Sequence, residues 1–266
     1  MMNITKIMNG ISPLWGICGF EKIKNNLIEC RAKNRLPENA KSVIVACFPY
    51  LLPEESYKNS NISKYAVVTD YHSVAINRLQ SACDELKKIY PEEEFVCFAD
   101  NSPVPEVSAA CFAGLGVRGM NSLLITKKYG SYVFIGEIVT SLEIEAESRE
   151  IKPCDGCGKC IEECPAKALD VKGVDTEKCL SAITQKKGAL APEEEKLMLE
   201  CGCVWGCDIC QDICPMNKNA AVTEINEFLS SPVPVLTLQT ELDGRAYEWR
   251  GRKVTERNLN LFKNNI

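Results

Sequence analysis

The chain has 266 residues, of which 45% are hydrophobic and 25% charged, and its formal net charge is −5. This length allows one large domain and a small one, and the composition is that of an ordinary globular protein. The negative charge excludes a bulk electrostatic attraction to nucleic acid. No apolar run reaches the roughly 18 residues that a membrane-spanning helix needs, and the N-terminal segment shows no export signal, so we expect a cytoplasmic protein without a membrane partner.

Residues 1–145 predict a mixture of helices and strands. An amphipathic helix is expected over Glu21–Lys33, after the apolar LWGICGF. A second helix is expected over Asp70–Tyr90, where apolar residues recur at helical spacing and Asp70 or Thr69 is available as a cap. Three apolar, β-rich runs predict strands at Ser42–Phe48, Phe95–Ala99 and Ser131–Val139. We therefore expect an α/β or α+β layer, and the sequence leaves its strand order open.

The polar segment EIEAESREIKP, residues 143–153, predicts a linker to a cysteine-rich module. We expect an α/β domain over 1–145, a cysteine-rich domain over 146–220 and a C-terminal extension over 221–266. The extension contains SSPVPVLTLQ, which breaks helical periodicity, and a short basic and amide-rich tail.

Sixteen cysteines are present, and ten of them lie between residues 154 and 214. In a chain without an export signal, this clustering favours metal or redox chemistry over disulfides. The other six lie in apolar surroundings, where free cysteines are usually small core residues. These six are Cys18, Cys30, Cys47, Cys83, Cys97 and Cys111.

A complete C-x2-C-x2-C-x3-C-P motif runs from Cys154 to Pro165, and a second copy ends at Pro215 with Val204 in the place of its first cysteine. Thiolates at this spacing are typical of two 4Fe–4S clusters, and the last cysteine of each motif reaches across to the other cluster. Zinc is the alternative, but zinc ligands usually come as two separated knuckles. One cluster would be held by Cys154, Cys157, Cys160 and Cys214. The second would be held by Cys164, Cys207 and Cys210, with a fourth ligand that spacing leaves open among Cys179, Cys201 and Cys203.

The chain also resembles the epoxyqueuosine reductases, which are cobalamin-dependent iron–sulfur enzymes that act on a queuosine precursor in tRNA. The resemblance rests on CDGCGKCIEECPAKAL, DTEKCLSAIT and WGCDICQDICP, and on the upstream stretches DYH, FADNSPVPE, AGLGVRGMNSLL and YGSYVFIGEI. It runs from about residue 40 to residue 217. It implies an α+β (mixed α/β) corrinoid-reductase-like domain followed by a bacterial-ferredoxin-like module with two 4Fe–4S clusters.

By this resemblance, Cys179 supplies the missing cluster ligand and Asp100 is the proton-donating aspartate. A base-off corrinoid, the cobalamin, would lie between the N-terminal domain and the cluster module. Its contacts would fall at Tyr71, His72, Asp100, Asn121, Ser122, Ser181 and Asp208. Asp100 follows the apolar FVCFA, so we expect burial to raise its pKa and keep it protonated. The alternatives are a turn-forming role for Asp100 and a structural role for His72, the only histidine.

The implied reaction reduces an epoxide to an alkene with two electrons and two protons. Two clusters and a corrinoid would pass the electrons singly from a low-potential donor of the ferredoxin or flavodoxin type. The chain departs from the family at Val107 and Met120, where members often carry Arg and Lys that would face the substrate. We expect a short form of the family, without the C-terminal helical-repeat domain that helps to hold tRNA. Two alternatives stay open: a paralogue with these cofactors and a different small substrate, and an electron-transfer protein without a corrinoid.

Overall fold

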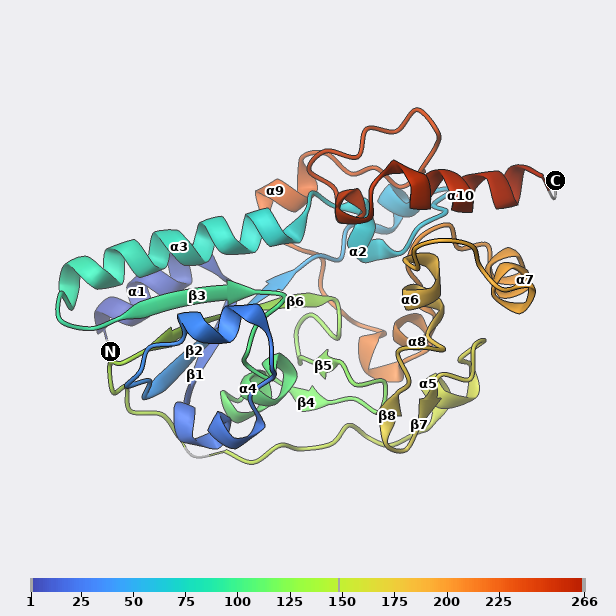
Figure 1. Cartoon of the computed structure of the whole chain (residues 1–266). Helices are drawn as coiled ribbons and strands as arrows, with labels where there is room; N and C mark the ends of the chain where they lie inside the picture. Colours follow the sequence, from blue (N-terminus) through green and yellow to red (C-terminus); the bar gives the residue numbers. More distant parts are fainter. Residues whose placement is uncertain (1, 148, 265–266) are drawn as a thin grey trace.

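The computed structural model describes residues 2–147 and 149–264. Its N-terminal half is built on a four-stranded antiparallel sheet in the order β1-β2-β6-β3 (Figure 1). The strands are β1 (Leu14–Gly19), β2 (Ser42–Pro49), β3 (Phe95–Ala99) and β6 (Val133–Thr140). The three predicted strands are therefore confirmed, as is the mixed α+β class, whereas β1 was not predicted.

The sheet is buried on both faces. Successive residues of β2 point to opposite sides, so Ile44, Ala46 and Phe48 enter one core while Val43 and Val45 enter the other. Helices α1 (Met2–Ile11) and α3 (Tyr71–Ile89) cover the first face, and α4 (Glu106–Phe112) covers the second. This double burial explains why the predicted strands are nearly continuous apolar runs.

Helix α3 confirms the helix predicted over Asp70–Tyr90. Its cap is Asp70, whose side chain accepts a hydrogen bond of 3.2 Å from the backbone N–H of His72. Capping satisfies a backbone donor that has no partner within the helix, and it fixes the first turn. The turn that carries Tyr71 and His72 is thereby held beside the C-terminal end of β3.

The predicted helix over Glu21–Lys33 is wrong. That segment forms three short 3-10 turns, at Phe20–Lys22, Lys24–Asn26 and Arg31–Arg35, with extended backbone at Leu27 and Cys30 between them. Ile23 is fully buried against the second face of the sheet, so packing of separate apolar anchors overrides helical propensity. Five of the six scattered cysteines are buried as expected, but Cys30 is only partly buried.

The cysteine-rich module contains short helices that pack around the two motifs. Helix α5 (Lys159–Glu162) lies inside the first motif and α8 (Ile209–Asp212) inside the second, and these two helices pack together. The other elements of this part are β7 (Leu169–Asp170), β8 (Gly173–Val174), α6 (Leu180–Thr184) and α7 (Pro192–Cys201). The remaining short elements upstream are α2 (Lys64–Val67), β4 (Val117–Arg118), β5 (Leu124–Ile125) and a 3-10 turn at Glu54–Tyr57.

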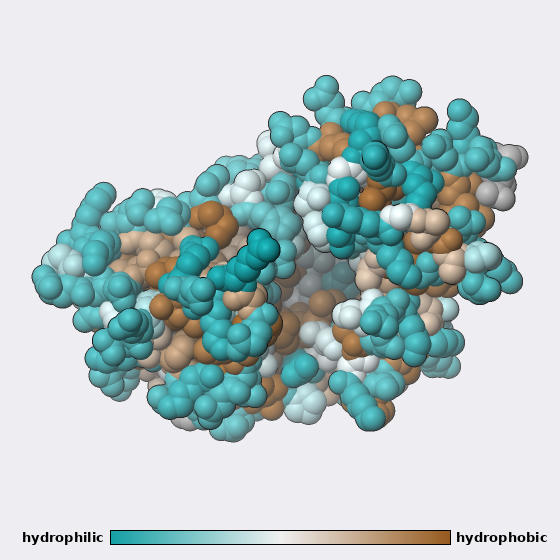
Figure 2. Space-filling view, in the orientation of Figure 1, coloured by the Kyte–Doolittle hydropathy of each residue, from teal (hydrophilic) through white to brown (hydrophobic). Residues whose placement is uncertain are grey.

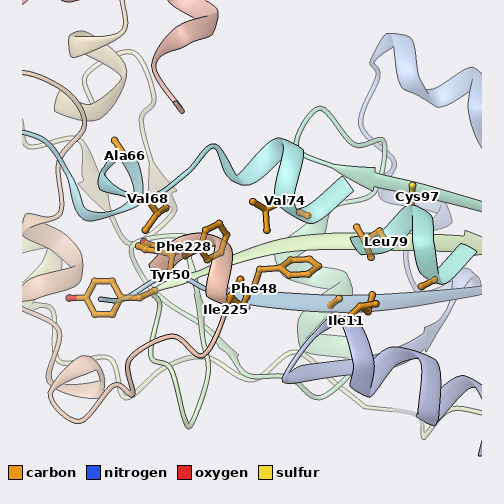
Figure 3. Close-up of a cluster of buried hydrophobic side chains, with 14 of the residues drawn as sticks. Ile11, Phe48, Tyr50, Ala66, Val68, Val74, Leu79, Cys97, Ile225 and Phe228 are labelled. Carbon is orange, nitrogen blue, oxygen red and sulfur yellow. The ribbon is translucent and has the colours of Figure 1, made fainter. Parts of the chain in front are cut away.

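The C-terminal segment packs against both halves of the molecule. Phe228 of α9 (Asn226–Leu229) is fully buried in the core that also contains Phe48 of β2 and Tyr50, which directly follows β2 (Figure 3). The predicted tail forms α10 (Arg252–Lys263), where Asn258 donates hydrogen bonds of 2.8 Å to the carbonyls of Thr184 and Val204. Among the described residues, no helix has the length and apolar character that crossing a membrane requires.

Candidate active site

Two groups of four cysteines surround two cavities. The first group, called the first cage, lines a cavity of about 20 Å³ and consists of Cys154, Cys157, Cys160 and Cys214. The second cage lines a cavity of about 510 Å³ and consists of Cys164, Cys179, Cys207 and Cys210. Each cage thus combines cysteines from both motifs, and the structure places Cys179 in the second cage at the start of α6.

The two further cysteines of this region lie beside the second cage. The thiol of Cys203 shares a hydrogen bond with the thiol of Cys207, and Cys201 belongs to the same apolar cluster. Neither Cys201 nor Cys203 is among the residues that line the cavity of the second cage. In the part of the chain that the structure describes, no three His, Cys, Asp or Glu side chains meet tightly enough to hold a single metal ion. Donor sets of four thiols around a shared cavity fit a cluster.

The cavity that the second cage lines is the cluster-side cavity, and its other walls include aromatic side chains. Tyr50, Tyr65, Tyr71 and Phe134 line it, and its lining is mostly apolar. A neighbouring cavity of about 660 Å³, the acid-side cavity, shares the walls Tyr65 and Tyr71 with it. Figure 2 shows a hollow between the sheet half and the cluster half, with neutral and hydrophobic residues inside it.

The acid-side cavity contains a charged relay around the only histidine. His72 lies 2.6 Å from Asp70 through Nδ1 and 2.9 Å from Asp100 through Nε2. Its ring stacks on Tyr71 at a centroid distance of 4.0 Å, and Tyr71 stacks on Phe134 at 4.0 Å. A ladder of rings from the sheet therefore fixes the imidazole between two carboxylates.

This arrangement decides the charge states of the pair. Partial burial acts to lower the pKa of His72, but hydrogen bonds to Asp100 and Asp70 outweigh it and raise the pKa to about 9. The hydrogen bond from His72 holds the pKa of Asp100 below its ordinary value of 3.8, although partial burial acts in the opposite direction. The expectation of a protonated Asp100 is thus wrong, because the proton resides on the imidazole at neutral pH.

Asp100 lies in a strained turn after β3. Its φ is +55° and that of Asn101 is +37°, values that residues other than glycine rarely adopt. Such strain is common where a loop has to present a functional side chain. The Asp100 side chain is 58% exposed, so it is accessible from the cavity.

Two further carboxyl groups lie behind Asp100. Glu106 at the start of α4 is partly buried, and this burial together with the charge of Asp100 raises its pKa to about 7. Glu137 of β6 is fully buried, and burial, followed by the charge of Glu106, raises its pKa well above 4.5. The Ser102 hydroxyl lies near Glu137, but neither carboxyl oxygen makes a well-formed hydrogen bond to any residue that the structure describes. A buried carboxyl without a partner keeps its proton.

The remaining predicted contacts divide between the cavities. Asn121 and Ser181 line the cluster-side cavity, and Ser181 also lines the acid-side cavity. Ser122 instead lines a separate cavity next to Asp100 and accepts a hydrogen bond of 3.2 Å from the backbone N–H of Val174. Asp208 does not line these cavities, and its partly buried carboxylate accepts a hydrogen bond of 2.6 Å from the backbone N–H of Lys64.

The two positions that depart from the family have different surroundings. Val107 lines a cavity of about 170 Å³ together with Asp100 and Tyr71, so it lies close to the acid. Met120 packs against the cysteines of the first cage, and it is not a residue of the acid-side cavity. In this chain, position 120 therefore lies beside the first cage.

Several residues of the cavities were missed by sequence reasoning. Trp249 lines the acid-side cavity and Arg250 the cluster-side cavity, although both belong to the C-terminal segment. Tyr50 and Tyr65 were also missed, because aromatic residues in apolar runs are usually core residues. Only the basic character of the tail indicated that it has a role beyond packing.

The fold and the two cages define an iron–sulfur oxidoreductase with a large cavity beside its second cage. Family comparisons agree. Residues 153–217 match a 4Fe-4S double cluster binding domain, and residues 31–101 match the epoxyqueuosine reductase QueG family. Among curated relatives, the epoxyqueuosine reductase of Lactococcus garvieae is 33% identical over 260 residues, covering 91% of this chain and 73% of the relative. That of Leadbetterella byssophila is 38% identical over 196 residues, covering 73% and 64%.

Solved structures give the same result. Epoxyqueuosine reductase from Streptococcus thermophilus matches 99% of this chain and 80% of its own, with a TM-score of 0.81 and 26% identity. An epoxyqueuosine reductase solved with an epoxyqueuosine-modified tRNA-Tyr stem loop matches 97% and 79%, with a TM-score of 0.81 and 21% identity, and shares the fold. The chain belongs to the epoxyqueuosine reductase family.

Proposed function

We propose that this chain reduces the epoxide of epoxyqueuosine in tRNA to an alkene, using two 4Fe–4S clusters and a corrinoid. The observation that carries the proposal is the pair of cavities that share Tyr65 and Tyr71 as walls. One of them contains the second cage and the other contains His72 and Asp100. A substrate between them would meet a source of electrons and a source of protons.

The two cages are proposed to form a path for electrons. Cys157 of the first cage is exposed, which suits uptake from a low-potential donor of the ferredoxin or flavodoxin type. The second cage faces the cluster-side cavity, and α5 and α8 pack the two cages against each other. Cys160 and Cys164 are buried, so the inner ligands are shielded from water, which favours low cluster potentials.

The lining of the cluster-side cavity suits a corrinoid, because it is largely apolar and carries aromatic rings, and the acid-side cavity adjoins it. The residues that would contact it include Tyr71, Asn121 and Ser181. Both ring nitrogens of His72 are engaged by carboxylates, so the only histidine would not be free to coordinate a bound corrinoid. When bound, a corrinoid supplies one-electron chemistry at a reactive metal centre.

His72 and Asp100 are proposed to supply a proton to the leaving oxygen. Conversion of an epoxide to an alkene consumes two electrons and two protons and releases one water molecule. At neutral pH the imidazole holds a proton on Nε2, directed at the Asp100 carboxylate. Asp100 is the more exposed of the two, so it is placed to pass this proton into the cavity.

The substrate class is supported by family membership and by the C-terminal segment. The net charge of −5 gives no general attraction to RNA. Three cations, Arg250, Arg252 and Lys253, nevertheless follow Trp249 in the sequence, and Trp249 lines the acid-side cavity. Cations gathered beside a cavity can position a phosphate backbone even on an acidic protein.

The test combines cofactor and substrate. Anaerobically purified protein with both clusters is titrated with cobalamin and followed by absorbance, and it is then assayed on tRNA that contains epoxyqueuosine under a strong reductant. We expect a base-off spectrum and formation of queuosine. A loaded enzyme without turnover would reject the substrate, in favour of a paralogue with another substrate. No spectral change at saturating cobalamin would favour an electron-transfer protein.

A further inference from the structure

Trp249 is an exposed indole on the wall of the acid-side cavity. It lies in the 3-10 turn Glu248–Arg250 and is 58% exposed, whereas Trp205 is fully buried. The same cavity is lined by Asp70, His72 and Asp100. A large apolar ring left open to a cavity that also holds charged catalytic groups is a common feature of ligand sites.

The indole is held on a rigid support. Tyr247, two residues earlier, is fully buried and packs edge-on against Trp205 at a centroid distance of 5.9 Å. The turn is closed by a hydrogen bond of 2.7 Å from the Gly251 N–H to the Glu248 carbonyl. A ring presented by a fixed turn loses little entropy when a ligand stacks on it.

Arg250 adds a cation to this ring. Its guanidinium carbon lies 3.6 Å from the centre of the Trp249 indole. Within the described part of the chain, this guanidinium is the only partner of the indole, and the indole N–H donates to no side chain or carbonyl. One of the two faces of the ring therefore carries the guanidinium, and 58% of the residue is exposed to a stacking partner.

Arg250 also has an unsatisfied donor. Its Nε is buried and has no hydrogen-bond partner among the described residues. The side chain lines the cluster-side cavity, so the two consecutive residues Trp249 and Arg250 reach both cavities. A buried guanidinium donor without an acceptor costs free energy, which a ligand oxygen would recover.

We propose that Trp249 and Arg250 form a clamp for the flat, nitrogen-containing base of the substrate nucleotide. The indole stacks on the base, and Arg250 Nε donates to an oxygen of the same nucleotide. The clamp rests on the proposed function and deepens it, because it holds the substituent of the base between His72–Asp100 and the cluster-side cavity. Trp249 and Arg250 are thus specificity-determining residues that position the substrate without taking part in proton transfer.

Bound cobalamin also carries a flat heterocyclic base with a phosphate, so the experiment has two arms. Trp249→Ala, Trp249→Phe and Arg250→Lys are prepared with both clusters, and iron content verifies folding. One arm measures the Kd of a fluorescently labelled anticodon stem loop containing epoxyqueuosine by anisotropy, together with KM and kcat. The other arm measures the Kd of cobalamin by absorbance. Trp15→Ala is the control, since Trp15 lies on β1, away from both cavities.

Removing an aromatic side chain on which a base stacks lowers the binding affinity by about 5- to 100-fold. We expect Trp249→Ala to raise the Kd and KM of the stem loop by this factor, Trp249→Phe to keep most of the affinity, and Arg250→Lys to weaken it. The Trp249 and Arg250 variants should bind cobalamin with the Kd of wild type. The control variant Trp15→Ala should bind both the stem loop and cobalamin as wild type does. If wild type binds and converts the stem loop and Trp249→Ala does so with the same Kd and KM, the clamp is refuted and the proposed function stands. The clamp is also refuted if the Trp249 and Arg250 variants bind cobalamin more weakly than wild type. A wild type that neither binds nor converts the stem loop would overturn the proposed function and the clamp together.

Discussion

The charge of His72 is the most direct test of the site geometry. A pKa of about 9 makes His72 about 99% protonated at pH 7, whereas the ordinary value of 6.5 would give about a quarter. Replacing Asp100 by Asn removes one of the two carboxylates that stabilise the imidazolium and leaves Asp70 in place. We expect the titration midpoint of His72 in Asp100→Asn to fall by about one pH unit or more.

Nuclear magnetic resonance can measure this midpoint without ambiguity, because the chain contains a single histidine. The ring C–H shifts are followed between pH 5 and pH 10 in wild type and in Asp100→Asn. Asp84→Asn is the matched control, since Asp84 is a carboxylate on the same helix that does not contact His72. A wild-type midpoint near 6.5, or an identical midpoint in Asp100→Asn, would refute the paired arrangement.

The same shift predicts a pH dependence of stability. Because the pKa of His72 is raised on folding, its contribution to the free energy of unfolding is complete below pH 6.5 and is lost as the pH rises through about 9. The full shift corresponds to about 3 kcal/mol, which solvent screening reduces to about 1–2 kcal/mol because 34% of the side chain is exposed. The stability difference between wild type and Asp100→Asn in denaturant unfolding should therefore be larger at pH 6 than at pH 9.5.

Two other predictions concern the cages and the buried carboxyls. Cys179→Ala should retain about four iron atoms per chain and Cys203→Ala about eight, and iron analysis giving the reverse result would exchange their roles. Above pH 4.5 the unfolded chain ionises Glu137 while the folded chain keeps it protonated. Wild type should therefore lose stability relative to Glu137→Gln by up to about 1.4 kcal/mol per pH unit. Parallel unfolding free energies of the two proteins between pH 5 and pH 7 would contradict a neutral Glu137.

Local patterns in the sequence determined the elements that depend on neighbouring residues. The spacing of the cysteines indicated two clusters, because ligands three residues apart meet around one site whatever the rest of the chain does. The continuous apolar run of β2 and the helical spacing of α3 with its cap at Asp70 were also readable. The helix predicted over residues 21–33 does not form, because the apolar residues of this segment pack separately on the sheet.

Only the tertiary structure decided which distant groups meet. Spacing left Cys179, Cys201 and Cys203 equivalent, and the fold places Cys179 alone among the residues that line the second cage. The charge of Asp100 depends on His72, 28 positions earlier, because an ion pair outweighs partial burial. Trp249 reaches the cavity because the C-terminal segment packs across both halves of the molecule. Protonation and ligand contacts depend on distances in space, and a sequence specifies these only through the complete fold.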